Sequence, residues 1–208
     1  MRISPARILT LEEVFQIVEF LRDGDTLDYL LNLAIFRLSA CCGMRCKEIH
    51  GLDIHDFYHN GEYPFVNIRK EITKGEKGKR KIRKIPLWWD KETYDDLSAW
   101  HKVRLKQTDG ENGPFIAALR SHFRGQRISK HGIAGHWTRT IARVLGADRA
   151  RSLSIHCGRH SFTSLAHAAG IPLASIRDAL GHSSLAVTDM YCHSVLDDGL
   201  RDIFTKKG

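Results

Sequence analysis

The sequence predicts an α+β fold that is mainly α, in which a helical domain carries a small three-stranded antiparallel sheet on one side. Apolar residues recur at helical spacing over residues 10–42 and again after residue 90. Between them, residues 54–87 form strand-like segments separated by the turn pair Asn60-Gly61 and by the Gly-containing residues 75–78. The length of 208 residues suits one domain, so we expect a single domain over residues 1–208.

Two helices are expected near the N-terminus. Thr10 and Glu13 form a capping-box pattern, and apolar residues follow them at helical spacing as far as residue 21. A second, more apolar helix is predicted from about Thr26 to Cys42, with Gly43 in the C′ position that favours glycine. A short helical turn over residues 44–49 follows.

The predicted sheet begins with residues 54–59, which pair with a strand running from Tyr63 to Lys74. A return strand is expected from Lys79 to Leu87. Residues 69–84 hold nine lysines and arginines against two acids. Like charges that face each other across paired strands repel, so this basic hairpin is expected to lie against something anionic.

After Asp90 the pattern returns to helix. Residues 107–129 contain glycines and no clear periodicity, which predicts a surface loop. Trp137 is expected to belong to the core. The predicted helices cover residues 91–106, 130–145, 159–169, 172–180 and a short stretch near 184–191.

The charge is concentrated in two segments. The formal net charge is +8, and residues 120–151 form a second basic segment with eight lysines and arginines against one acid. Two interpretations remain open on charge alone: a polyanionic partner, or a pair of solvated basic loops. No apolar run approaches the roughly 18 residues of a membrane span, and no signal peptide is recognisable, so we expect a cytoplasmic protein.

The five cysteines raise the question of a zinc site. Cys42 and Cys46 could share a helical face, but no second ligand pair follows at zinc-finger spacing. Buried, reduced thiols explain the cysteines better, and we expect no metal.

Four stretches combine the residue types that bind and attack a phosphodiester. Arginine forks match phosphate oxygens, histidine and lysine move protons, and tyrosine can serve as a covalent nucleophile. No acidic cluster accompanies them, which argues against metal-assisted hydrolysis. The stretches are residues 43–49, the hairpin around Lys74, residues 156–160, and residues 180–184 leading to Tyr191.

These residues resemble the tyrosine recombinase (phage integrase) family, whose catalytic core is shared with type IB topoisomerases. Each motif alone is weak, but all occur in order and at family-like spacing from about Leu9 to Val195. The motifs are Cys42-Gly43-Met44-Arg45-Cys46-Lys47-Glu48, the His-x-x-Arg-His box from His156 to His160, Leu180-Gly181-His182-Ser183-Ser184, and Tyr191 nine residues after His182.

The resemblance implies a role for each matching residue. Tyr191 would attack the scissile phosphate and form a 3′-phosphotyrosyl link, leaving a free 5′-hydroxyl. Arg45 and Arg159 would hold the non-bridging oxygens in the transition state. His156 would accept a proton or orient the phosphate, and His182 would hydrogen-bond a phosphate oxygen. Because the covalent link conserves the phosphodiester energy, neither ATP, a metal nor another cofactor is expected.

The general acid that protonates the departing 5′-oxygen would be a hairpin lysine. We choose Lys74, with Lys77 and Lys79 as alternatives. The chain departs from the family at Cys157-Gly158, where Asp-Leu is usual, and this changes the local packing.

Two neighbouring residues are expected to serve the structure. His160 would bond backbone near the site. Glu48 would support Arg45 or cap a turn.

DNA contacts and assembly follow from the same resemblance. The expected partner is double-stranded DNA, with the helix over residues 130–145 a candidate for the major groove. The amphipathic tail from Val195 to Phe204 would exchange between protomers of a homo-oligomer, a tetramer on DNA that is weak or monomeric without it, or would pack within its own chain. The expected DNA-binding residues are Lys77, Lys79, Arg80, Arg120, Arg124, Arg127, Lys130 and Arg139.

Family members usually carry a further N-terminal DNA-binding domain, which is absent here, so the chain is expected to be a catalytic fragment or a short protein. The competing hypothesis is a non-catalytic DNA-binding regulator that retains the fold. A metal-dependent nuclease that uses the histidines and cysteines is a remote third.

Overall fold

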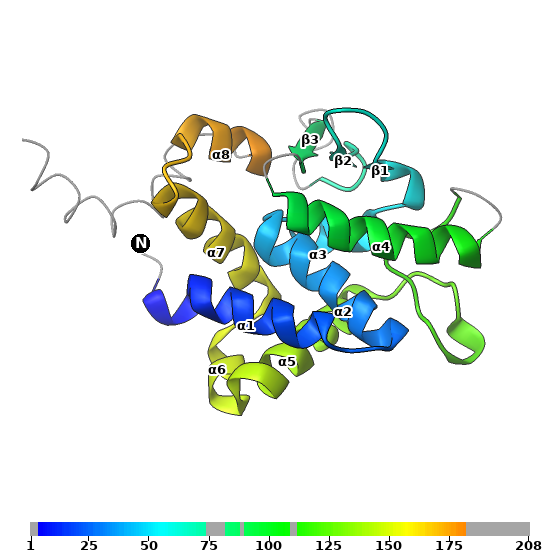
Figure 1. Ribbon diagram of the computed structural model, residues 1–208, viewed down its shortest axis with the longest axis horizontal. Helices are drawn as coiled ribbons and strands as arrows, with labels where there is room; N and C mark the ends of the chain where they lie inside the picture. The colour runs from blue at the N-terminus through cyan, green and yellow to red at the C-terminus, as the bar shows by residue number, and fades with distance from the viewer. Residues whose placement is uncertain (1–3, 74–81, 88–89, 109–111, 182–208) are drawn as a thin grey trace, which may run out of the picture.

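A computed structural model describes residues 4–73, 82–87, 90–108 and 112–181. It is predominantly helical with a small sheet at one edge, which confirms the expected fold class (Figure 1). The described α-helices are α1 (Leu11–Arg22), α2 (Leu27–Phe36), α3 (Cys46–Gly51), α4 (Lys91–Gln107), α5 (Lys130–Leu145), α6 (Ala147–Ser152), α7 (Ile155–Ala168) and α8 (Leu173–Leu180).

The sheet contains three antiparallel strands in sequential order. Val66 is the centre of the register, since it pairs with Phe57 on one side and with Ile85 on the other. Val66 and Ile85 are both buried, so this face of the sheet closes over the core. The strands are β1 (Phe57–Tyr58), β2 (Phe65–Ile68) and β3 (Arg83–Pro86).

The strands are shorter than the sequence predicts. Residues 54–56 form a 3₁₀ turn instead of the start of β1. After β2 the chain turns, because the N–H of Ile72 donates to the carbonyl of Arg69, whose guanidinium is held by Asp53 and Asp56. These ion pairs draw residue 69 towards residues 53–56, so Ile72 lies in a turn and not in the predicted strand.

The helices differ from the prediction in three respects. The helix expected from residue 159 begins four residues earlier, at Ile155, so the His-x-x-Arg-His box lies inside α7. Helix α6 was not predicted. The long second helix ends in a π-helical turn, Arg37–Cys41, followed by Gly43 with φ of +63°.

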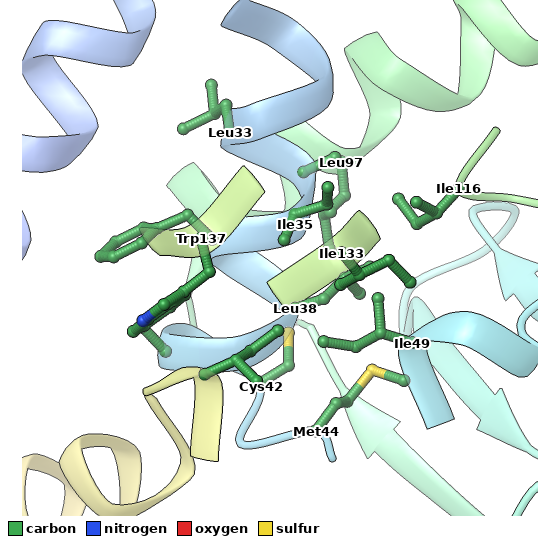
Figure 2. Packing of buried hydrophobic residues seen from close by; sticks show 14 of the residues in the cluster. Leu33, Ile35, Leu38, Cys42, Met44, Ile49, Leu97, Ile116, Ile133 and Trp137 are labelled. Atoms are coloured by element: carbon green, nitrogen blue, oxygen red, sulfur yellow. The ribbon is translucent and has the colours of Figure 1, made fainter. Parts of the chain in front are cut away.

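The main core lies between the helices and the inner face of the sheet. Trp137 is 1% exposed, stacks on Phe36 with ring centroids 5.4 Å apart, and donates from its indole N–H to the carbonyl of Leu153 at 2.7 Å. This confirms that Trp137 belongs to the core. Figure 2 shows the core's centre, with Leu33, Ile35, Leu38, Cys42, Met44, Ile49, Leu97, Ile116, Ile133 and Trp137 labelled.

A second, smaller core fixes α8. Phe162 and Ala166 of α7 pack with Ile176 and Leu180 of α8 as a separate buried cluster. Helix α8 also contacts β3, beside which it lies in Figure 1. The end of α8 is therefore set by α7 on one side and by the sheet on the other.

The N-terminal segment is anchored to the later helices. The expected capping box of α1 is present, because Thr10 Oγ1 accepts from the N–H of Glu13 and Glu13 accepts from the N–H of Thr10. The N–H of Leu9 donates to Ser161 Oγ at 2.8 Å, and Arg149 donates to both carboxylate oxygens of Glu13. The start of the chain thus packs on α6 and α7.

The four described cysteines carry free thiols, three of them buried. Burial raises the pKa of Cys42 well above its ordinary value, which keeps that thiol protonated and unreactive. This agrees with the predicted buried thiols. Within the described ranges, no helix combines the length and apolar character that a membrane span requires.

Gly158 allows α7 to approach the π-helical turn closely. A Cβ at this position would lie 2.3 Å from Ser39 Oγ, 3.1 Å from the Ser39 carbonyl carbon and 2.9 Å from a ring carbon of Trp137. Ser39 itself donates to the carbonyl of Ile155 at 3.0 Å. The departure from the family pattern at Cys157-Gly158 is therefore a packing feature, because a side chain at residue 158 would push α7 away from residue 39.

We predict that Gly158→Ala lowers the free energy of unfolding by about 2 kcal/mol, because backbone and a core ring must move to accommodate the methyl group. The measurement is urea denaturation. Gly135→Ala in α5 is the matched control, since its Cβ would meet the flexible end of Arg139 at 3.1 Å, so this variant should be as stable as the wild type or more so. Equal destabilisation by both changes would contradict the packing role of Gly158.

Candidate functional site

Glu48 is a fully buried carboxylate in the first turn of α3. Its Oε2 accepts a hydrogen bond from the backbone N–H of Arg45 at 2.8 Å, and its Oε1 accepts one from Arg45 Nη1 at 3.0 Å. Glu48 thus caps the helix and also supports the Arg45 side chain. Capping and support of Arg45 are alternatives on the sequence alone, and the structure contains both.

Arg83 of β3 binds the same carboxylate with two parallel hydrogen bonds, from Nη1 to Oε1 at 3.0 Å and from Nη2 to Oε2 at 2.9 Å. Its Nε donates to the carbonyl of Ala179, in the last turn of α8, at 2.9 Å. Arg83 is not among the site residues predicted from the sequence. Period-2 alternation was the available signal, since Arg83 shares a face of β3 with the buried Ile85.

Arg159 of α7 is the third arginine of the group. It is 5% exposed, and it donates to the carbonyl of Gly43 at 2.7 Å and to that of Leu180 at 2.6 Å. Its Nη1 lies 4.0 Å from Glu48 Oε2. The structure therefore brings Arg159 and Arg45 together around one carboxylate, although they are 114 residues apart in the chain.

Gly43 makes this convergence possible. Its positive φ of +63° suits glycine, and a Cβ there would lie 2.6 Å from Leu180 and 2.7 Å from Phe162. The turn at Gly43 directs its carbonyl to Arg159, and Arg45, two residues later, is the N-cap of α3.

The cluster carries three guanidinium groups and one carboxylate. Burial alone would raise the pKa of Glu48, but the hydrogen bonds and charge of Arg83, the backbone N–H of Arg45 and the charge of Arg159 lower it to about 2. Glu48 is thus ionised at neutral pH. The group retains a net positive charge, and the side chain of Arg45 is 25% exposed against 8% for Arg83, so Arg45 offers that charge to solvent.

Helix α7 also carries two histidines of the predicted box. His156 is exposed in the first turn, and His160 is half-buried one turn later. Burial is the largest cause that lowers the pKa of His160 to about 4, and the nearby Arg7, His156 and Arg159 lower it further. His160 is therefore neutral at physiological pH, as suits the structural role expected for it.

The second basic segment presents some of its predicted DNA-binding residues to solvent. Arg124, Lys130 and Arg139 are exposed, and Lys130 is the first residue of α5. Arg120 is exposed as well and forms an ion pair with Asp28. These four side chains are accessible to a partner.

Arg127 is placed differently from the other predicted DNA contacts. Its guanidinium pairs with Asp53 and donates to the carbonyls of His50 and Leu52, the latter at 2.9 Å. These bonds tie the loop before α5 to the end of α3. A phosphate would compete with them for Arg127, and this position stays a prediction.

Six of the predicted site residues lie outside the described residues. Helix α8 ends at Leu180, two positions before His182, which is one of the six. They are Lys74, Lys77, Lys79, Arg80, His182 and Tyr191.

One group in the described ranges has metal-ligating side chains within 4.8 Å of one another: Asp53, His55 and Asp56. Both carboxylates already neutralise arginines, since Asp53 pairs with Arg69 and Arg127 and Asp56 pairs with Arg69. Two guanidinium groups at this position oppose the binding of a cation.

The described site is a cluster of guanidinium groups in excess over carboxylate on a helical scaffold, with one arginine partly exposed to solvent, and such a cluster attracts anions. The chain matches the phage integrase family over residues 7–196. It belongs to that family. The curated relatives that it matches are named tyrosine recombinases.

Curated relatives agree with this assignment. The chain is 30% identical over 194 residues to the tyrosine recombinase XerC of Myxococcus xanthus, covering 89% of this chain and 57% of the relative. It is 33% identical over 171 residues to XerC of Corynebacterium efficiens, covering 82% and 49%. The chain thus spans about half the length of the curated relatives it matches.

Solved structures share the fold. The XerA recombinase aligns with a TM-score of 0.68 and 23% identity over 95% of this chain and 63% of that one. The integrase of transposon Tn1549, in complex with transposon right-end DNA, aligns with a TM-score of 0.68 and 19% identity over 96% and 65%.

Replacing the buried carboxylate should destabilise the fold. We predict that Glu48→Gln lowers the free energy of unfolding by about 3 kcal/mol at pH 7, because it leaves buried guanidinium charge uncompensated. Urea denaturation measures this. Glu19→Gln, on an exposed position of α1, is the control and should have almost no effect.

The same variant should change the acid stability. The folded-state pKa of Glu48 is about 2, below its ordinary value of 4.5, so its contribution is complete above pH 4.5 and is lost as the pH falls towards 2. Glu48→Gln should flatten the stability curve in that window. An unchanged slope would show that Glu48 is not a strongly stabilised anion.

His160 predicts a second pH window. The pKa of His160 is about 4 in the folded chain, against an ordinary value of 6.5. As the pH is lowered, the unfolded chain therefore binds a proton at a higher pH than the folded chain does, and the free energy of unfolding decreases from pH 6.5 to pH 4. His160→Gln should reduce the slope of stability against pH in this window when compared with the wild type. Parallel curves from pH 7.5 to 4 would contradict the neutral, half-buried His160.

Proposed function

We propose that this chain is a site-specific DNA recombinase that cuts and rejoins strands through a 3′-phosphotyrosyl intermediate, with Tyr191 as the nucleophile. The observation that carries the proposal is the convergence of Arg45 and Arg159 on Glu48 in a member of the phage integrase family. Relatives and neighbours support it, since their names describe tyrosine recombinases and integrases, some of them bound to DNA.

In the cleavage step, the Tyr191 oxygen bonds to the scissile phosphorus, and the bond from phosphorus to the 5′-oxygen breaks. Arg45 and Arg159 hold the non-bridging oxygens, where negative charge grows in the pentavalent transition state. Arg159 is preorganised by two backbone carbonyls, while the more exposed Arg45 meets the incoming phosphate. His182 would hydrogen-bond a phosphate oxygen.

Two protons move in this step. Free tyrosine ionises near pH 10, so its proton needs an acceptor, and the exposed His156 is our candidate. The departing 5′-oxygen takes a proton from a hairpin lysine, Lys74 by preference and Lys77 or Lys79 otherwise. Religation reverses these transfers with another 5′-hydroxyl, so the chemistry requires neither ATP nor a metal.

The proposed partner is double-stranded DNA. The exposed basic residues of the second segment would hold the backbone on one flank, and the lysine-rich hairpin would reach the scissile phosphate. We further propose a tetramer on DNA, linked by exchange of the tail from Val195 to Phe204, with weak association without DNA. A cytoplasmic location would give such a protein access to its DNA.

A nicked suicide duplex tests the chemistry directly. Incubated with this substrate in EDTA, the chain should form a covalent protein–DNA adduct, and Tyr191→Phe should form none while binding DNA normally. Adduct formation is measured on denaturing gels. Intact DNA binding without an adduct from the wild-type chain would favour the non-catalytic regulator, and an adduct from Tyr191→Phe would exclude Tyr191 as nucleophile.

The same assay identifies the general acid. Lys74→Ala should slow cleavage by a factor on the order of 100 to 1,000, the usual contribution of a positioned acid. Lys77→Ala and Lys79→Ala are the matched controls from the same hairpin. If one of them is slow while Lys74→Ala cleaves normally, the assignment moves to that lysine.

A further inference from the structure

Arg83 connects three parts of the candidate site that come from distant segments. It is the first residue of β3, and its guanidinium joins the Glu48 carboxylate to the Ala179 carbonyl. Its side chain is 8% exposed, and the contacts of its guanidinium are with protein groups, Glu48 and Ala179. All three nitrogens of the group are committed to these two partners.

Each partner of Arg83 is adjacent to an arginine proposed to hold the scissile phosphate. Through Glu48 it meets Arg45, which donates to the Oε1 atom that Arg83 also binds. Through Ala179 it fixes the end of α8, where the next carbonyl, that of Leu180, accepts from Arg159. Arg83 thus sets two of the acceptors on which Arg45 and Arg159 depend.

The end of α8 is also confined sterically by Arg83. Gly181 has φ of +63°, and a Cβ there would lie 2.9 Å from Arg83 Cδ. The chain therefore leaves α8 directly over the stem of this side chain. A change in the position of the Arg83 side chain would be passed to Gly181 and to the Leu180 carbonyl.

We propose that Arg83 is a positioning residue for DNA cleavage, which holds Arg45 and Arg159 in the geometry that neutralises the scissile phosphate. This inference rests on the proposed function. Arg83 touches no phosphate itself and acts through Glu48 and the C-terminal turn of α8. Positioning of this kind matters because a displacement of about 1 Å can cost on the order of 100-fold in rate.

Arg83→Lys tests the inference, because lysine keeps the positive charge beside Glu48 but cannot make the two parallel bonds and the bond to Ala179 together. We expect cleavage of the nicked suicide duplex to slow by about 30-fold or more. The affinity for the same duplex should stay within about threefold, since lysine keeps the positive charge and the contacts of Arg83 are with protein groups. Thermal unfolding and circular dichroism establish that the variant is folded.

A second substrate separates positioning from general loss of structure. A methylphosphonate at the scissile position replaces one charged non-bridging oxygen with a methyl group. Its transition state therefore carries less negative charge for the guanidinium groups to neutralise. The difference between wild type and Arg83→Lys should therefore shrink to a few-fold on this substrate. A variant that is merely distorted would be slowed equally on both substrates.

Arg69→Lys is the matched control. Arg69 also joins the sheet region to acidic side chains through paired contacts, but its carboxylate partners are Asp53 and Asp56 and not Glu48. It should cleave both substrates at nearly the wild-type rate.

The outcomes are distinct. A wild-type rate for Arg83→Lys, an equal slowing on both substrates, or the same substrate-selective slowing in Arg69→Lys would overturn the positioning role and leave the proposed function intact. No adduct from the wild-type chain on either substrate would overturn both.

Discussion

One buried anion, the carboxylate of Glu48, is the constraint on which the rest of the site depends. Three guanidinium groups of like charge would separate if they were left alone in a low-dielectric interior. Glu48 binds two of them directly and lies 4.0 Å from the third, so it makes their proximity tolerable. Because one negative charge faces three positive ones, the cluster keeps a net positive charge. A phosphate placed beside it would neutralise part of that charge.

Backbone carbonyls, together with Glu48, supply the acceptors for the clustered arginines. The carbonyls of Gly43, Ala179 and Leu180 accept from arginines of other elements, so the ends of two helical segments take part in the electrostatics. C-terminal carbonyls carry partial negative charge, which offsets some of the guanidinium excess without adding another acid. The positions of these carbonyls depend in turn on Gly43 and on the packing of α8, so backbone geometry and charge are settled together.

Local patterns predicted much of this architecture. The capping box at Thr10, the limits of α5, the burial of Trp137 and the support that Glu48 gives to Arg45 all follow from periodicity or short-range spacing. Features governed by distant partners were not predicted. The strands are short because Arg69 is drawn to acids more than a dozen residues earlier, and Arg83 is buried because its partners come from α3 and α8. Such contacts leave little trace in local sequence, although strand alternation gave a hint for Arg83.

Helix α8 rests on a core of its own, formed by four buried residues from α7 and α8, and is linked to the larger body by arginine–carbonyl bonds. Opening of this small unit would release the Leu180 and Ala179 carbonyls while Trp137 and the main core stayed packed. Global stability and catalytic readiness are therefore separate properties of this domain. A melting temperature reports on the first, and a chain that melts at its usual temperature can still have the arginines of the Glu48 cluster displaced from the geometry that the proposed reaction needs.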